Sequence, residues 1–260
     1  MARRAIRKKL RGWWPTALIL LAACAQTTRP QGDTGLEREV LVSAAASLSD
    51  AFAEIEAAFE EAHPGVDVVA NLGASSTLRE QILQGAPIDV FASANIANMD
   101  QVVSAGMTAG EPAVFATNLL QIAVPAGNPG DIAGLEDFAR SELLIGLCVA
   151  EAPCGAFARQ ALASAGVVAS VDTNEANVRA LLVKIELGEL DAGITYVTDV
   201  LSAGGTVAGV PIPDEHNIVA EYPIVVLADA PHPSAAAAFV AFVLSTEGQA
   251  ILGEYGFSSP

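Results

Sequence analysis

The chain has 260 residues, of which 13 are Lys or Arg and 30 are Asp or Glu, so its formal net charge is −17. This acidity argues against nucleic acid and anionic membrane surfaces as partners, because both repel a negative protein. With 52% hydrophobic residues, the chain can bury a substantial core.

The N-terminal stretch is typical of a signal peptide. Basic residues between Arg3 and Arg11 are followed by an apolar run at 13–23, which is too short to span a bilayer comfortably. The sequence L-A-A-C that ends at Cys24 is similar to a bacterial lipobox. We therefore expect residues 1–23 to be removed and Cys24 to become the lipidated first residue. An ordinary signal peptide cut after a small residue and an uncleaved anchor are the alternatives.

Removal of the signal peptide makes the protein more acidic. The mature chain would keep seven basic and 30 acidic residues, a formal charge of −23. Residues 24–37 are polar and contain Pro30, Gly32 and Gly35, which predicts a flexible tether between the lipid and the folded body. We expect an extracytoplasmic protein that is anchored to the cell membrane only through this lipid.

The body of the chain alternates short apolar runs with helix-period segments, which favours an α/β fold with mainly parallel sheets. Strands are expected at 40–45, 66–70, 90–92, 119–125, 143–148, 192–197 and 222–227. Helices are expected at 48–62, 77–84, 96–104, 155–165, 175–187 and 234–252.

Two strand-to-helix turns are small and rich in hydroxyl groups. They lie at 44–50 and 71–78, about one βαβ unit apart. The first N–H groups of a helix lack intrahelical partners, and the helix dipole adds positive charge there, so each turn suits an anion. The alternative is that Ser47 or Ser49 only caps the first helix.

Six motifs in this order resemble the periplasmic molybdate-binding proteins of ABC importers. They are A-A-A-S-L at 44–48, G-A-S-S-T-L at 73–78, G-A-P-I-D-V-F-A-S-A at 85–94, N-V-R-A at 177–180, G-I-T-Y at 193–196 and Y-G-F at 255–257. Each motif is weak alone, but together they cover nearly the whole mature chain.

The resemblance implies a two-lobed periplasmic-binding-protein fold of type II, with the ligand between the lobes. One lobe would comprise 38–117 and 219–260, and the other 118–218. The implied function is capture of molybdate or tungstate for delivery to the permease of an ABC importer. The alternatives are a receptor for sulfate or a small organic anion, and an accessory lipoprotein that has lost transport.

The resemblance also implies five ligand-binding residues. Ser47 and Ser75 would contribute from one lobe, and the N–H groups of Cys154 and Val178 and the hydroxyl of Tyr196 from the other. The molybdenum would be bound as an oxyanion and not as a bare cation, and no cofactor is expected. Without the other motifs, Tyr196 would be interpreted as an aromatic residue at a strand edge.

Charged side chains do not enter this predicted site. Arg79, Arg179 and Lys184 are expected to be solvated helix residues, since such charges are seldom buried. Because none of the five donors titrates near neutrality, binding is expected to vary little with pH between about 6 and 8.

Catalytic motifs are lacking, and we do not expect an enzyme. The sequence has no G-x-S-x-G, S-x-x-K or H-E-x-x-H pattern. His63, His216 and His232 are far apart, and two of them precede proline, which indicates loops and not metal ligands. Asp89 could act as a lone base, although a capping or turn role is commoner. We expect a monomer.

The remaining cysteines form a candidate disulfide. With Cys24 assigned to the lipid, Cys148 and Cys154 lie six positions apart in an oxidising compartment, and we predict that they are bridged. Two buried thiols are the alternative.

Overall fold

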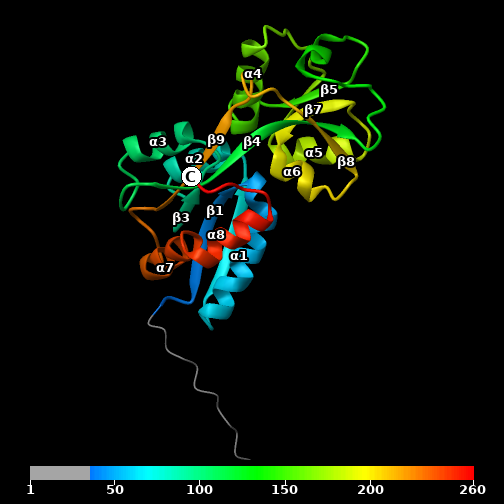
Figure 1. Cartoon of the computed structure of the whole chain (residues 1–260). Helices are drawn as coiled ribbons and strands as arrows, with labels where there is room; N and C mark the ends of the chain where they lie inside the picture. The colour runs from blue at the N-terminus through cyan, green and yellow to red at the C-terminus, as the bar shows by residue number, and fades with distance from the viewer. Residues whose placement is uncertain (1–35) are drawn as a thin grey trace, which may run out of the picture. The chain divides into compact units, whose positions relative to one another are not determined.

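The computed structural model describes residues 36–260 (Figure 1). The predicted signal peptide at 1–23, the lipidation site Cys24 and most of the tether at 24–37 lie outside the described residues.

The strands and helices alternate along the chain as the sequence predicts. The strands are β1 (Glu39–Ala45), β2 (Asp67–Gly73), β3 (Val90–Ala92), β4 (Ala113–Pro125), β5 (Ile145–Cys148), β6 (Thr173–Glu175), β7 (Ala192–Tyr196), β8 (Val207–Pro211) and β9 (Val219–Val226). The helices are α1 (Ser49–Ala62), α2 (Ser75–Leu83), α3 (Ile96–Ser104), α4 (Pro153–Ser164), α5 (Val178–Glu186), α6 (Val197–Ser202), α7 (Pro233–Val243) and α8 (Thr246–Glu254). Two 3₁₀ turns, η1 (Ala46–Leu48) and η2 (Leu135–Ala139), complete the set.

Two parallel groups of strands are joined by two long antiparallel strands. β1 is parallel to β2 and β3, and β5 is parallel to β6 and β7. The first part of β4 pairs with β9, and its second part pairs with β7 and β8 (Figure 1). We call β1–β3 with α1–α3, α7 and α8 the first lobe, and β5–β8 with α4–α6 the second lobe.

The pairing of β4 with β9 ends where Leu119 lies opposite Val219. We propose this point as the lobe boundary, next to the division at 38–117 plus 219–260 and 118–218 that the sequence predicts. In that division the chain crosses between the lobes once on β4 and once on β9.

Four differences from the expected elements have local causes. β6 and β8 are short and carry little apolar periodicity, so only their pairing with β5 and β4 defines them. Helix α5 begins at Val178 and not at 175, because Thr173–Glu175 pairs as β6. The helix expected at 234–252 is divided into α7 and α8, since the Ser245 hydroxyl accepts from the N–H of Gly248 and caps a new helix. The short helix α6, directly after β7, was not expected.

The first-lobe core is built on phenylalanine. Phe52 and Phe59 of α1 pack edge-to-face on Phe239 of α7, with ring centroids 6.1 and 5.3 Å apart. All three side chains are fully buried, and each burial stabilises the fold by roughly 1.5–3 kcal/mol. This core fixes the start of α1 against β1.

Within residues 36–260, no single helix is long and apolar enough to cross a membrane. Helices α7 and α8 pass the length and hydropathy test only as a pair, and that pair is bent by 60°.

A disulfide links Cys148, the last residue of β5, to Cys154 in the first turn of α4. Arg159 reinforces the same corner, because its guanidinium donates to the carbonyls of Cys148 and Gly155 at 2.8 and 2.9 Å. The start of α4 is therefore held by both a covalent and a polar clamp.

We expect the disulfide to be present in the mature protein and to add stability. Reduction should lower the free energy of unfolding by about 2 kcal/mol, because the bridge restricts the unfolded chain over a short loop. Intact mass without reductant, followed by alkylation of the unfolded protein and urea titrations with and without reductant, provides the check. Two alkylated thiols at Cys148 and Cys154 would show that the bridge does not form.

Candidate functional site

The N-terminal ends of η1, α2, α4 and α5 converge on one small cavity. It contains about 220 Å³ of space not filled by protein atoms, a volume that includes open solvent at its mouth. Its lining residues are Ala45, Ala46, Ser47, Gly73, Ala74, Ser75, Ala94, Ala152, Pro153, Cys154, Asn177, Val178 and Tyr196. None of these side chains carries a formal charge at neutral pH. The cavity thus offers dipoles and hydroxyl groups to a small occupant.

The backbone of these helix starts is free to donate. The first intrahelical bonds of α4 and α5 are made by Ala156 and Leu181, so the earlier N–H groups of each helix have no intrahelical partner. Asn177 caps α5 by accepting from the N–H of Ala180 at 3.0 Å, which leaves the N–H of Val178 open. Pro153 at the first position of α4 is followed by Cys154, whose N–H is likewise open.

Gly155 allows α4 to start close to the preceding turn. A Cβ atom added there would lie 2.0 Å from the carbonyl oxygen of Val149, which no side chain tolerates. The first turn of α4, with Cys154, is therefore placed at the cavity by backbone contact.

All five predicted site residues line this cavity. The fold therefore brings together residues from both lobes that the sequence analysis grouped. Ser75 accepts a hydrogen bond from the N–H of Ala94 at 2.9 Å, so its own proton remains available to donate. Ser47 lies 2.9 Å from the hydroxyl of Tyr222. Both serines are almost completely buried.

Tyr196 carries the clearest sign of a missing partner. Only 1% of the residue is exposed, and its hydroxyl has no hydrogen-bond partner within residues 36–260. Burial first, and then the neighbouring Tyr222 and Asp199, raise the pKa of Tyr196 well above its usual value. The hydroxyl thus stays protonated as a donor, and leaving a buried donor unpaired costs about 1–3 kcal/mol.

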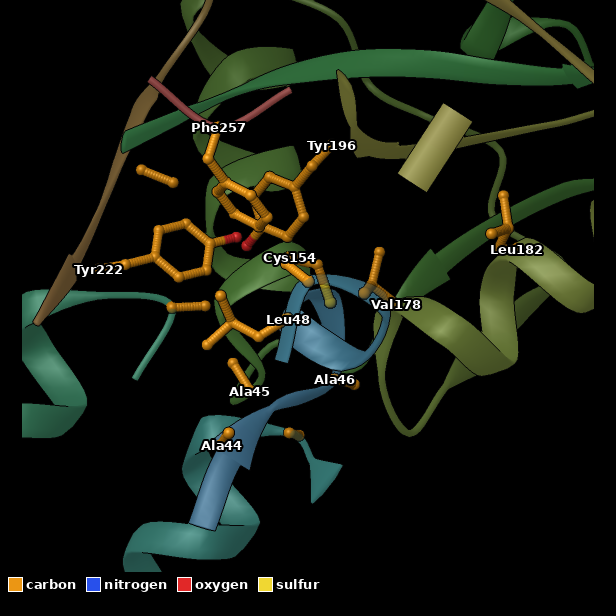
Figure 2. Close-up of a cluster of buried hydrophobic side chains, with 14 of the residues drawn as sticks. Ala44, Ala45, Ala46, Leu48, Cys154, Val178, Leu182, Tyr196, Tyr222 and Phe257 are labelled. Atoms are coloured by element: carbon orange, nitrogen blue, oxygen red, sulfur yellow. The ribbon is translucent and has the colours of Figure 1, made fainter. Parts of the chain in front are cut away.

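Tyr222 of β9 was not identified by sequence reasoning. Its ring packs against those of Tyr196 and Phe257 (Figure 2). The ring centroids are 6.1 and 5.4 Å apart. Burial raises the pKa of Tyr222, so it can donate to Ser47 and leave the Ser47 proton for the cavity. The sequence pointed to this part of the site only through the Y-G-F motif, which contains Phe257, a neighbour of Tyr222 in the fold.

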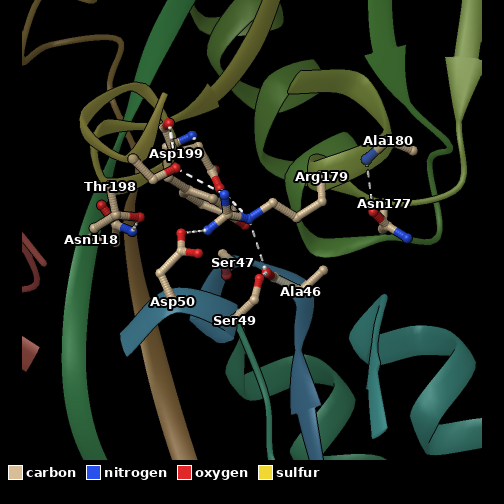
Figure 3. Close-up of polar contacts among 12 residues, drawn as sticks. Ala46, Ser47, Ser49, Asp50, Asn118, Asn177, Arg179, Ala180, Thr198 and Asp199 are labelled. Atoms are coloured by element: carbon tan, nitrogen blue, oxygen red, sulfur yellow. Dashed lines mark hydrogen bonds and ion pairs between the residues drawn. The ribbon is translucent and has the colours of Figure 1, made fainter. Parts of the chain in front are cut away.

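Arg179 contradicts the expectation of a solvated helix residue. Its guanidinium bonds to the carboxylate of Asp50, to the hydroxyl of Ser202 at 2.8 Å and to the carbonyl of Ala46 at 3.3 Å (Figure 3). It also lies 3.6 Å from a carboxylate oxygen of Asp199. In this polar cluster only Asp199 is fully buried, and the cluster lies beside the cavity without lining it.

The other two cations differ from each other. Arg79 is also less solvated than expected, because its side chain is only 15% exposed and donates to Asn98 at 2.8 Å. Lys184 remains partly exposed and pairs with Glu175 at 2.6 Å. Neither side chain lines the cavity.

Asp199 is a fully buried carboxyl group behind Tyr196, from whose N–H it accepts a bond at 3.1 Å. Burial raises its pKa to about 7, against the opposing charge of Arg179. The expected flat pH profile of binding considered only the five donors and omitted this group. Because an anion in the cavity disfavours an ionised Asp199, a flat profile no longer follows from the structure.

Asp89 has a structural role. Its carboxylate accepts from the N–H groups of Leu41 and His232 at 2.7 and 2.6 Å and contacts the imidazole of His232 at 2.9 Å. It therefore ties β1 to the loop before α7. Among the residues that the structure describes, no group of three or more His, Cys, Asp or Glu side chains could hold a metal ion.

The cavity can therefore do one thing well, which is to surround a small anion with neutral donors. Hydroxyl and N–H groups enter from both lobes, and the helix dipoles favour negative charge at the same point. A two-lobed α/β fold with such a cavity between the lobes defines a solute-binding protein of the periplasmic type II class.

Comparison with known proteins agrees with this class. The family model described as bacterial extracellular solute-binding protein matches residues 40–258, and the chain belongs to this family. The molybdate-binding protein ModA of Mycobacterium tuberculosis is 39% identical over 243 residues, which cover 94% of this chain and 93% of that protein. The predicted fold class and the resemblance drawn from the six motifs are thereby confirmed.

Two further similarities are informative. YvgL of Bacillus subtilis, whose name describes an ABC transporter substrate-binding lipoprotein, is 29% identical over 251 residues, covering 94% of this chain and 95% of YvgL. A solved structure named as the substrate binding domain of a molybdenum ABC transporter from Clostridium difficile has a TM-score of 0.65 and 27% identity. It covers 85% of this chain and 99% of its own.

The raised pKa of Asp199 predicts a pH-dependent stability. Between the unfolded pKa near 4 and the folded pKa of about 7, the folded state binds more protons, so stability falls as pH rises through this window. We expect the wild type to lose about 2–3 kcal/mol between about pH 5 and 8 relative to Asp199→Asn. Urea midpoints of both proteins across this range measure the difference, and parallel curves would contradict the assignment.

Proposed function

We propose that this protein captures molybdate or tungstate outside the cytoplasm and delivers it to the permease of an ABC importer. The observation that carries the proposal is the buried Tyr196 hydroxyl, which has no hydrogen-bond partner within residues 36–260 and lies in a small cavity of neutral donors. The similarity of the chain to proteins named as molybdate-binding supports the choice of ligand.

Five ligand contacts are proposed, from Ser47, Ser75, Cys154, Val178 and Tyr196. Hydrogen bonds to a charged acceptor contribute roughly 1.5–3 kcal/mol each, so five would supply about 8–15 kcal/mol before the costs of closure and ordering. A free energy of about −8 kcal/mol already corresponds to micromolar binding. Neutral donors are therefore sufficient, and no cation is needed at the ligand.

The size and protonation of the anion would give selectivity. Sulfate is a smaller tetrahedral dianion, so it would leave some donors unpaired or prevent full closure. Phosphate near neutral pH carries a proton, which needs an acceptor that this all-donor set lacks. Molybdate and tungstate have nearly the same size and charge and would bind alike.

The remaining features of the proposal concern location and assembly. We propose a lipid anchor at Cys24, in keeping with the lipoprotein name of the Bacillus subtilis relative. The protein would act as a monomer, touch the membrane only through this lipid and catalyse no reaction. Molybdate would be the transported ligand, so no cofactor is invoked.

Anion selectivity provides the main test. Calorimetry on the mature chain should give submicromolar binding of molybdate and tungstate, and affinities for sulfate and phosphate at least about a hundredfold weaker, since two or three buried donors would be left unpaired. Comparable binding of sulfate would instead favour a sulfate receptor. No heat with any of the four anions would favour a receptor for a small organic anion.

The Tyr196 hydroxyl can be tested directly. We expect Tyr196→Phe to weaken molybdate binding about ten- to hundredfold, since one hydrogen bond to a charged acceptor is lost, without lowering stability. Tyr255→Phe is the matched control, because its hydroxyl is bonded to Glu54 on the surface at 2.8 Å. Unchanged affinity in Tyr196→Phe would remove this residue from the site.

A further inference from the structure

Arg179 connects the two lobes beside the cavity. It belongs to α5 of the second lobe, yet its guanidinium bonds to the carboxylate of Asp50 in α1 and to the carbonyl of Ala46 in η1. Both acceptors belong to the first-lobe segment that follows β1. Figure 3 shows the guanidinium between Asp50 and Asp199, with Ala46 and Ser47 next to it.

The second lobe holds Arg179 in position. The Ser202 hydroxyl accepts from the guanidinium at 2.8 Å, and the Asp199 carboxylate lies 3.6 Å from it. Ser202 is itself fixed, because its hydroxyl donates to the carbonyl of Asp199 at 2.9 Å. Groups of its own lobe therefore orient the guanidinium before it meets the other lobe, which reduces the ordering cost of the contact.

The contact is adjacent to the proposed ligand donors on both sides. Arg179 follows Val178, and Ala46 precedes Ser47, so each end of the interlobe contact is one peptide bond from a cavity-lining donor. Arg179 itself does not line the cavity. It can thus stabilise the closed state without competing for the ligand.

We propose that Arg179 is a positioning residue that latches the two lobes together, and that its contacts with Asp50 and Ala46 set how long the anion is retained. This inference rests on the proposed function. The contacts exist only when the lobes are closed, so they favour the closed state and slow dissociation. Entry of the anion also requires the lobes to open, so loss of these contacts should not slow association.

The charge balance supports a latch over a simple surface pair. The Arg179 and Asp50 side chains are 26% and 44% exposed, so solvent partly screens this pair, while the fully buried Asp199 places a less screened carboxylate on the other side of the guanidinium. Separating the lobes would leave Asp50 without its cation, while Arg179 would keep Asp199. Of the contacts of Arg179, only those with Asp50 and Ala46 in the first lobe therefore favour closure.

The test compares Arg179→Gln and Asp50→Asn with Arg140→Gln. Arg140 is the matched control, because its partners Asp137, Glu142 and the carbonyl of Gly130 all belong to the second lobe. Molybdate binding is measured by stopped-flow, with tyrosine fluorescence as the signal. Two of the chain's three tyrosines, Tyr196 and Tyr222, lie at or beside the cavity. Both Trp residues lie within the predicted signal peptide at 1–23.

We expect Arg179→Gln to raise the dissociation rate at least about tenfold, with association no slower than in the wild type. Asp50→Asn should raise the dissociation rate similarly. The double variant should dissociate no faster than Arg179→Gln alone, because both changes remove the same contact. Arg179→Lys should restore part of the retention. A dissociation rate like that of Arg140→Gln, or additive effects of Arg179→Gln and Asp50→Asn, would overturn the latch.

Small-angle X-ray scattering without ligand separates the latch from the proposed function. Arg179→Gln should have a larger radius of gyration than wild type, because its lobes open more often, whereas Arg140→Gln should not. If wild type does not bind molybdate, the proposed function fails, but this comparison still decides the latch. Equal radii for wild type and Arg179→Gln would overturn it.

Discussion

The structure depends on the convergence of four helix starts on one uncharged cavity. Each start contributes N–H groups that have no partner in their own helix, and burial makes an unpaired donor costly. The tight approach of Gly155 to Val149 and the clamp at Cys148 and Cys154 hold the second-lobe donors, while Tyr222 orients Ser47 in the first lobe. The donors are thus oriented before any ligand enters, which reduces the entropy lost on binding.

The cations of the protein are kept out of this cavity. Arg159 satisfies backbone carbonyls at the start of α4, and Arg179 is occupied by Asp50, Asp199 and Ala46. A guanidinium aimed into the cavity would bind carboxylates and phosphate bidentately and reduce discrimination among anions. Neutral donors discriminate among anions by the number and the spacing of their oxygen atoms. The charged groups instead hold together the parts of the lobes around the cavity.

The sequence, through its resemblance to a known family, predicted the residues that line the cavity better than the residues around it. Ser47, Ser75, Cys154, Val178 and Tyr196 lie in short motifs, which can be compared along a sequence without knowledge of the fold. Tyr222 and Arg179 act through partners 175 and 129 residues away, Ser47 and Asp50, and no periodicity encodes such pairs. For the same reason β6 and β8 were missed, since pairing with distant strands defines them, and Arg179 was interpreted as solvated.

Asp199 links the electrostatics of the latch to the ligand. If both carboxylates were ionised, Asp50, Asp199 and Arg179 would together carry one negative charge beside a cavity meant for an anion. A pKa of about 7 lets Asp199 take up a proton at modest cost, which leaves the Arg179–Asp50 pair neutral. An anion that enters therefore favours the protonated form of Asp199 and meets no net charge behind Tyr196. The group that weakens the folded state at higher pH is thus also the one that can adjust its charge when the cavity fills.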